Sequence, residues 1–122
     1  MCKGLGLDLC GISRMEALLR DERFLNRYFT PAETAYVHAK GAGAAQTLAG
    51  LYAAKEAVLK AMGVGIALPL QEVEIFYGSG GQPQVRLTGR AAQQLAGMGG
   101  GSFLLTITHE GDTAAAAALW QA

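Results

Sequence analysis

The segment between residues 46 and 62 restricts the possible folds of this chain more than any other. Its large apolar side chains fall at helical spacing: Leu48, Leu51, Tyr52, Leu59 and Met62. Such spacing predicts an amphipathic helix whose apolar stripe must be covered by other elements. Gly63 follows directly, and glycine is the usual residue just beyond a helix end. We therefore predict a helix over residues 46–62 that needs a surface to pack against.

A strand is predicted close to the N-terminus, over residues 3–9. Three leucines alternate there with two glycines and one carboxylate: Leu5, Leu7 and Leu9 with Gly4, Gly6 and Asp8. Residues two apart share a face of a strand, so the two sets lie on opposite faces. We expect the leucine face to enter the core. The glycine face, which carries Asp8, is then a bare surface on which another group can approach the backbone.

The second half of the chain is predicted to be mostly strand. Alternating apolar residues mark segments at 72–77, 83–88, 103–108 and 114–120. Turns at 78–81 and 110–112 separate these segments in pairs, which predicts two hairpins. A short helix is expected near 89–97. The last strand is rich in alanine, which indicates close packing by a helix or by a neighbouring subunit.

Two further helix starts carry capping signals. Thr30, Pro31 and Glu33 are typical of an N-cap, a first helical position and a capping box, so a helix is expected over about 31–39. Ser13 and Glu16 have the same spacing and predict a short helix that starts at Arg14. The run of glycine and alanine at 41–45 breaks the pattern, and we expect a mobile loop there.

These elements predict an α+β fold in which a small antiparallel sheet packs on one long helix, with short helices around it. The 122 residues form a single domain over 1–122. Hydrophobic residues make up 51% and charged residues 16%, which suggests that part of the surface is buried against other subunits.

The charge balance excludes some classes of partner. Ten basic and ten acidic residues give a formal net charge of zero, which argues against a general nucleic-acid binder. We find no apolar run of membrane-spanning length and expect no secretory leader, so a cytoplasmic location is expected. Cys2 and Cys10 are then free thiols, to which we assign no catalytic role.

Four side chains suggest chemistry. Asp8 and Glu56 are carboxylates that suit a hard cation such as Mg²⁺, which takes oxygen ligands. Lys60 lies one helical turn beyond Glu56 and just before Gly63 and Gly65, where it can hold a phosphate oxygen beside an accessible backbone. His109 ends a strand and can donate a hydrogen bond or carry a proton. Taken singly, each of these residues is more often an ordinary surface residue.

The order of several motifs is more specific than any single residue. The chain resembles the holo-(acyl carrier protein) synthases, a family of 4′-phosphopantetheinyl transferases, over essentially its whole length. The matching segments are 4–9 with Ile12 and Arg14, 24–30 with Glu33, the central signature at 48–65, 81–83 and 105–109.

This resemblance implies an enzyme that forms a compact homotrimer with active sites between adjacent subunits. Such an enzyme transfers the 4′-phosphopantetheine of coenzyme A to a serine of an apo-acyl carrier protein and releases 3′,5′-ADP. By position in the motifs, the implied metal ligands for Mg²⁺ are Asp8 and Glu56. The implied coenzyme A contacts are Lys60, Gly63, Gly65, Pro83 and His109. The implied contacts with the acidic carrier protein are Arg14, Arg23, Phe24 and Arg27.

The implied catalytic groups are Asp8, Glu56 and Lys60. The serine hydroxyl attacks the β-phosphorus of coenzyme A, while the metal and Lys60 stabilise charge on the phosphoryl oxygens. The proton acceptor stays open between a metal-bound water or hydroxide and Glu56. His109 ranks lower, because the resemblance places it near the nucleotide.

Two departures from the family pattern bear on binding. Leu51 stands where the family often has a basic residue, and residues 41–49 carry no charge. Both changes remove potential partners of the 3′-phosphate or of the carrier protein.

Two other functions stay open: a Mg²⁺-dependent hydrolase that cleaves the coenzyme A pyrophosphate, and a non-catalytic module that binds coenzyme A or a carrier. The arginine-rich second segment argues against the hydrolase.

Overall fold

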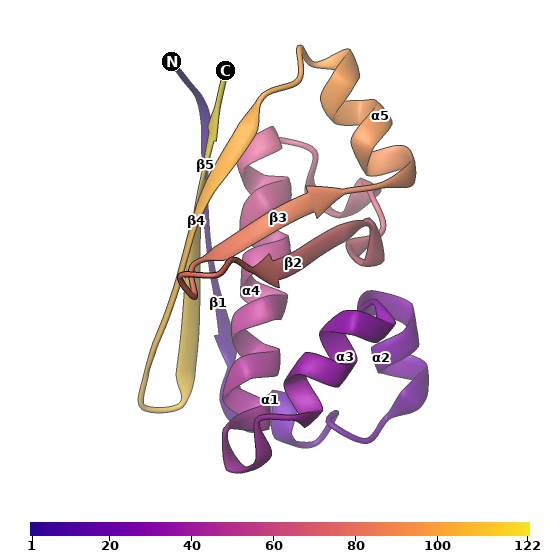
Figure 1. Cartoon of the computed structure of the whole chain (residues 1–122), viewed down its shortest axis with the longest axis vertical. Coiled ribbons are helices and arrows are strands. Elements are labelled where there is room, and N and C mark those ends of the chain that lie inside the picture. The colour runs from indigo at the N-terminus through magenta and orange to yellow at the C-terminus, as the bar shows by residue number, and fades with distance from the viewer.

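A computed structural model describes residues 1–122 apart from the side chain of Ile66, and it has the predicted α+β architecture (Figure 1). The described helices are α1 (Ile12–Glu16), α2 (Glu22–Tyr28), α3 (Pro31–His38), α4 (Ala44–Met62) and α5 (Gly89–Gly97). The strands are β1 (Cys2–Gly11), β2 (Val73–Tyr77), β3 (Pro83–Leu87), β4 (Ser102–Glu110) and β5 (Thr113–Gln121). Short 3₁₀ turns are η1 (Gly41–Gly43), η2 (Gly65–Ala67) and η3 (Leu70–Glu72).

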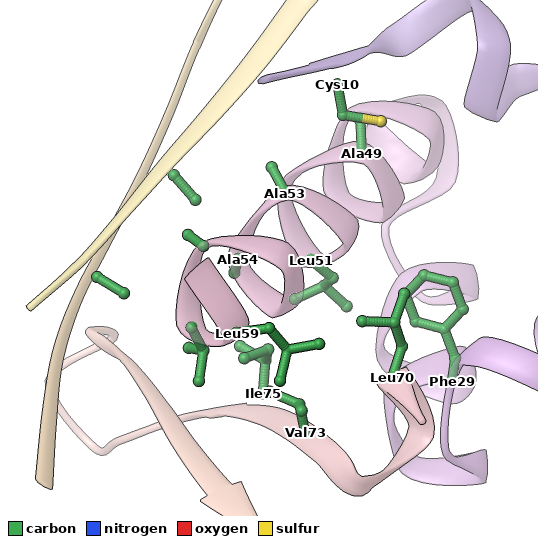
Figure 2. Packing of buried hydrophobic residues seen from close by; sticks show 14 of the residues in the cluster. Cys10, Phe29, Ala49, Leu51, Ala53, Ala54, Leu59, Leu70, Val73 and Ile75 are labelled. Carbon is green, nitrogen blue, oxygen red and sulfur yellow. The ribbon is translucent and has the colours of Figure 1, made fainter. Parts of the chain in front are cut away.

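Helix α4 is the centre of the fold. A three-stranded antiparallel sheet in the order β1-β5-β4 covers one side of it, and the hairpin of β2 and β3 lies on another side (Figure 1). Figure 2 shows Leu59 of α4 beside Val73 and Ile75 of β2. The alternate alanines of β5, Ala114, Ala116 and Ala118, are buried. Their small side chains let the sheet approach α4 closely, so the predicted packing by a helix is confirmed.

The predicted orientation of β1 is wrong. Leu5, Leu7 and Leu9 are 71%, 63% and 64% exposed, and the glycine face packs on α4 instead. A Cβ atom on Gly6 would lie 1.9 Å from the carbonyl oxygen of Ala57. The helix backbone therefore approaches the strand so closely that no side chain fits between them. The leucines point outward because that contact is available to glycine alone.

The boundaries of most elements agree with the sequence, with three further corrections. Thr30 and Glu33 form the expected capping box at the start of α3. Ser13 does not form one, because its hydroxyl donates to Asp112 Oδ1 at 2.6 Å. The break at 41–45 contains η1, and α4 starts at Ala44. Helix α2 was not predicted; the Asp21 side chain caps it by accepting a hydrogen bond from the Phe24 amide.

A buried ion pair ties three elements around α4. Lys55 Nζ lies 2.8 Å from Glu33 Oε1, and both side chains are fully buried. Lys55 also donates to the carbonyls of Leu70 and Val73, while Glu33 accepts from the Ile75 amide. Burial lowers the pKa of Lys55, and the neighbouring Glu33 opposes that shift. The pair is internally satisfied, so we assign it to structure.

No described helix is both long and apolar enough to cross a lipid bilayer.

Candidate functional site

The close contact between β1 and α4 brings three of the predicted residues together. Asp8 lies on the face of β1 that packs on α4, and Glu56 and Lys60 lie one turn apart on the helix. Lys60 Nζ lies 2.8 Å from Asp8 Oδ1 and 3.0 Å from the Leu7 carbonyl oxygen. Gly6 allows this approach, because it leaves no side chain between strand and helix.

The charges in this cluster perturb one another. Burial raises the pKa of Glu56, and the charge of Asp8 raises it further, while Lys60 and Arg14 act in the opposite direction. The hydrogen bond to Asp8 raises the pKa of Lys60. Two carboxylates that repel each other, one on a strand and one on a helix, form a site where added positive charge is favourable.

The donor set fits Mg²⁺. Within the part of the chain that the structure describes, no group of three or more His, Cys, Asp or Glu side chains converges in a metal-binding arrangement. Mg²⁺ is commonly held by one or two carboxylates and completes its shell with waters and substrate phosphates.

An open stretch of backbone follows Lys60. Gly63 ends α4 with a φ of 74°, and Gly65 has a φ of 59°. A Cβ at either position would meet nothing described within 4 Å, so the backbone there is accessible from outside. Positive φ and open space together explain why glycine stands at both positions.

Pro83 and His109 lie elsewhere. Both line a hollow of about 390 Å³ beside α4, together with Tyr36, Lys40 and Tyr77. His109 belongs to β4 and Asp8 to β1, which are the two opposite edges of the three-stranded sheet. The structure therefore divides the predicted coenzyme A contacts between two locations on one chain.

The hollow around His109 has an aromatic wall. Tyr36 and Tyr77 stack with their ring centroids 4.6 Å apart, and Lys40 Nζ lies 4.4 Å from the centre of the Tyr36 ring. Burial, with Tyr36 nearby, raises the pKa of Tyr77 to about 12. The phenol therefore stays neutral at physiological pH. The sequence did not predict a role for Tyr36, Tyr77 or Lys40, because none of them belongs to a recognisable motif.

The predicted carrier contacts form a basic and aromatic surface beside Glu56. Phe24 packs against Tyr28 and Tyr52, with centroids 5.1 and 6.3 Å away. The Arg14 guanidinium lies 5.5 Å from the centre of the Tyr52 ring, and that of Arg27 lies 5.3 Å from the Tyr28 ring.

Arg23 is exposed on α2. A hollow of about 410 Å³ separates this surface from α5, and Tyr28, Tyr52 and Arg90 line it. The sequence did not predict a place in the site for Tyr28, Tyr52 or Arg90. Tyr52 could have been assigned to it, because it lies one helical turn before Glu56.

Comparisons with known proteins agree with this arrangement. Residues 4–117 match the family model described as ACPS: 4′-phosphopantetheinyl transferase superfamily. A holo-[acyl-carrier-protein] synthase of Treponema denticola is 44% identical over 117 residues, with 95% of each chain covered. The enzyme of that name from Moorella thermoacetica is 43% identical, covering 93% of this chain and 90% of the relative.

Solved structures with the same fold include two bacterial synthases. The holo-[acyl-carrier-protein] synthase of Neisseria meningitidis superposes with a TM-score of 0.89 at 27% identity, with both chains fully covered. The Helicobacter pylori synthase, in complex with coenzyme A, gives 0.83 at 26% identity, covering 96% of this chain and 99% of the other.

Proposed function

The chain belongs to the 4′-phosphopantetheinyl transferase superfamily as an enzyme of the holo-[acyl-carrier-protein] synthase type. From that premise we propose that it transfers 4′-phosphopantetheine from coenzyme A to a serine of an apo-acyl carrier protein, with Mg²⁺ bound and 3′,5′-ADP released. The observation that carries the proposal is the cluster of Asp8, Glu56 and Lys60 beside the open backbone of Gly63 and Gly65.

Asp8 and Glu56 are the proposed metal ligands. When bound there, Mg²⁺ neutralises charge on the pyrophosphate oxygens and polarises the phosphorus. Burial, and then the charge of Asp8, raise the pKa of Glu56, and a cation bound there would offset both effects.

Lys60 is the proposed contact for the phosphoryl group. Its side chain is half exposed and is held by Asp8, so it can turn to a phosphate without crossing the core. The backbone of Gly63 and Gly65 then accommodates the rest of the pyrophosphate.

The transfer step forms a bond from the serine oxygen to the β-phosphorus and breaks the bond from that phosphorus to the 3′,5′-ADP oxygen. The serine proton must leave as the bond forms. Glu56 is one candidate to accept it, and a water held in the site is the other. Lys60 stabilises negative charge on the non-bridging phosphoryl oxygens while negative charge builds up on the leaving 3′,5′-ADP oxygen.

The active unit is proposed to be a homotrimer. The outer face of the sheet exposes leucines in register across three strands, with Leu5 opposite Leu119 and Leu119 opposite Leu104. Large apolar surfaces of this kind mark protein interfaces. Because β4 and β1 are opposite edges of the sheet, we propose that Pro83 and His109 of one copy complete the coenzyme A site at Asp8 of the next.

The surface formed by Arg14, Arg23, Phe24 and Arg27 is the proposed docking site for the carrier protein. Arg14 and Arg27 stack on aromatic rings near Glu56, so an acidic partner would be oriented with its serine close to the metal ligands. Complementary charge across such a contact speeds encounter and fixes orientation.

Release of 3′,5′-ADP tests the proposal against its alternatives. The protein is incubated with coenzyme A and Mg²⁺, with and without an apo-acyl carrier protein, and the nucleotides are separated chromatographically. We expect 3′,5′-ADP when the carrier is present. Release without carrier would indicate a hydrolase, and no release with several carriers would indicate a binding module.

A further inference from the structure

Arg90 occupies an unassigned position opposite the arginine-rich surface. It is the second residue of α5 and lines the same hollow as Arg27 of α2, although the two residues are far apart in the sequence. Tyr28, Tyr52 and Leu70 line the same hollow. The hollow therefore has an aromatic and aliphatic lining, with one arginine from α2 and one from α5.

Neither guanidinium is neutralised within the described part of the chain. The ion pairs found there join Lys55 to Glu33, Lys60 to Asp8 and Arg86 to Glu74. Glu56 also lines the hollow, but it makes no ion pair with Arg27 or with Arg90. Two unpaired arginines that face one cavity favour an anionic occupant.

The backbone that carries Arg90 is fixed. Glu72 Oε1 accepts a hydrogen bond from the Ala91 amide at 3.0 Å, which anchors the start of α5. The Glu72 carboxylate is therefore occupied by the start of α5. It also packs closely there, since a Cβ on Gly89 would lie 2.6 Å from it. The base of the Arg90 side chain is held in place, and its charge is left for another partner.

The hollow remains accessible in the proposed trimer. In Figure 1 the three-stranded sheet lies on one side of α4, while α2 and α5 lie on the other side. The leucine face that would be buried between copies points away from α2 and α5.

We propose that Arg90 is a specificity-determining residue that binds an acidic side chain of the carrier protein, so that the carrier enters a cleft with one cationic wall on α2 and another on α5. This inference rests on the proposed transfer function. Contact on two sides fixes the rotation of an acidic helix about its own axis, which contact with α2 alone would leave free. Carriers with acids spaced for both walls would be preferred.

The test compares Arg90→Gln with Arg20→Gln in the full-length protein, with apo-acyl carrier protein and coenzyme A as substrates. Arg20 is an exposed arginine in the loop before α2, makes no ion pair in the described structure and lines none of the hollows described above, so its removal changes the net charge equally.

We expect Arg90→Gln to raise KM for the carrier about tenfold, which corresponds to about 1.4 kcal/mol. KM for coenzyme A, kcat and Tm should be unchanged, Arg90→Lys should recover most of the loss, and the effect should shrink at high salt.

The possible results separate the two proposals. If the wild type modifies no carrier, the transfer function itself fails. If the wild type is active and Arg90→Gln matches it, or if Arg20→Gln raises KM for the carrier equally, the assignment of Arg90 is overturned. A fall in kcat with unchanged KM for the carrier would also overturn it, because Arg90 would then act on the chemical step.

Discussion

Lys60 Nζ lies 2.8 Å from Asp8 Oδ1, so a lysine from the last turn of α4 reaches across to a carboxylate on the first strand. Both residues keep some exposure, with side chains that are 51% and 18% accessible. Exposed ion pairs contribute little to folding, so the geometry is better explained by the chemistry of the site.

Lys60→Gln is expected to lower kcat about 10²- to 10³-fold, the usual loss when one stabilising contact to a transition state is removed. Tm should change little, because the side chain is exposed. Steady-state kinetics and thermal unfolding of the same preparation check this. A variant with normal kcat would remove Lys60 from the reaction.

Glu56→Gln is expected to abolish most transfer and to stabilise the metal-free protein at neutral pH. Burial and the charge of Asp8 raise the pKa of Glu56 in the folded state above its unfolded value. A carboxyl with a raised pKa stabilises the fold below its unfolded pKa and loses that contribution as pH rises through the folded pKa. The neutral glutamine removes this cost above the folded pKa.

Thermal unfolding of Glu56→Gln and the wild type from pH 4 to 8, in chelator, measures this effect. The difference in Tm should grow as pH rises. A variant that is less stable than the wild type at neutral pH would show that Glu56 has a structural role instead.

Leu7→Glu is expected to convert the trimer into monomers. Leu7 is 63% exposed in the single chain, so the substitution should not disturb the monomer fold, but it would place charge inside the proposed interface. Sedimentation velocity measures the change. Gln84→Glu on β3, which is also exposed, is the control and should remain trimeric. A monomeric wild type would contradict the proposed assembly.

Gly6→Ala is expected to destabilise the fold by about 1–3 kcal/mol or more, in the range of overpacked cores. The added Cβ would lie 1.9 Å from the Ala57 carbonyl oxygen, so β1 would have to move away from α4 and carry Asp8 with it. Gly43→Ala is the control, because a Cβ there would meet nothing described within 4 Å. Equal denaturation midpoints for the two variants would show that the contact is not tight.

Local patterns in the sequence predicted most elements but not which face of each is covered. The period of two in β1 correctly separated the leucines from the glycines. It could not show that α4 packs directly against the glycine backbone. That contact depends on the tertiary structure, and it leaves the leucines on the outer face. Similarly, Ser13 has the spacing of a capping residue, but its hydroxyl donates a hydrogen bond to Asp112, which lies near the other end of the sequence.

The candidate site was predictable where residues belong to one helix or one motif. Glu56 and Lys60 share a face by spacing alone, and the resemblance to the family singled out Asp8 on the strand. Arg90 and the tyrosine pair around His109 were missed, because their role depends on which elements meet in space. The separation of His109 from Asp8 also required the strand order.

The intact mass of an apo-acyl carrier protein, measured after incubation with this protein, coenzyme A and Mg²⁺, reports the proposed transfer without any intermediate assay. We expect a gain of one phosphopantetheine that is lost on chelation and is absent with Glu56→Gln. An unchanged carrier mass with the wild type, across carriers of fatty-acid and polyketide type, would contradict it.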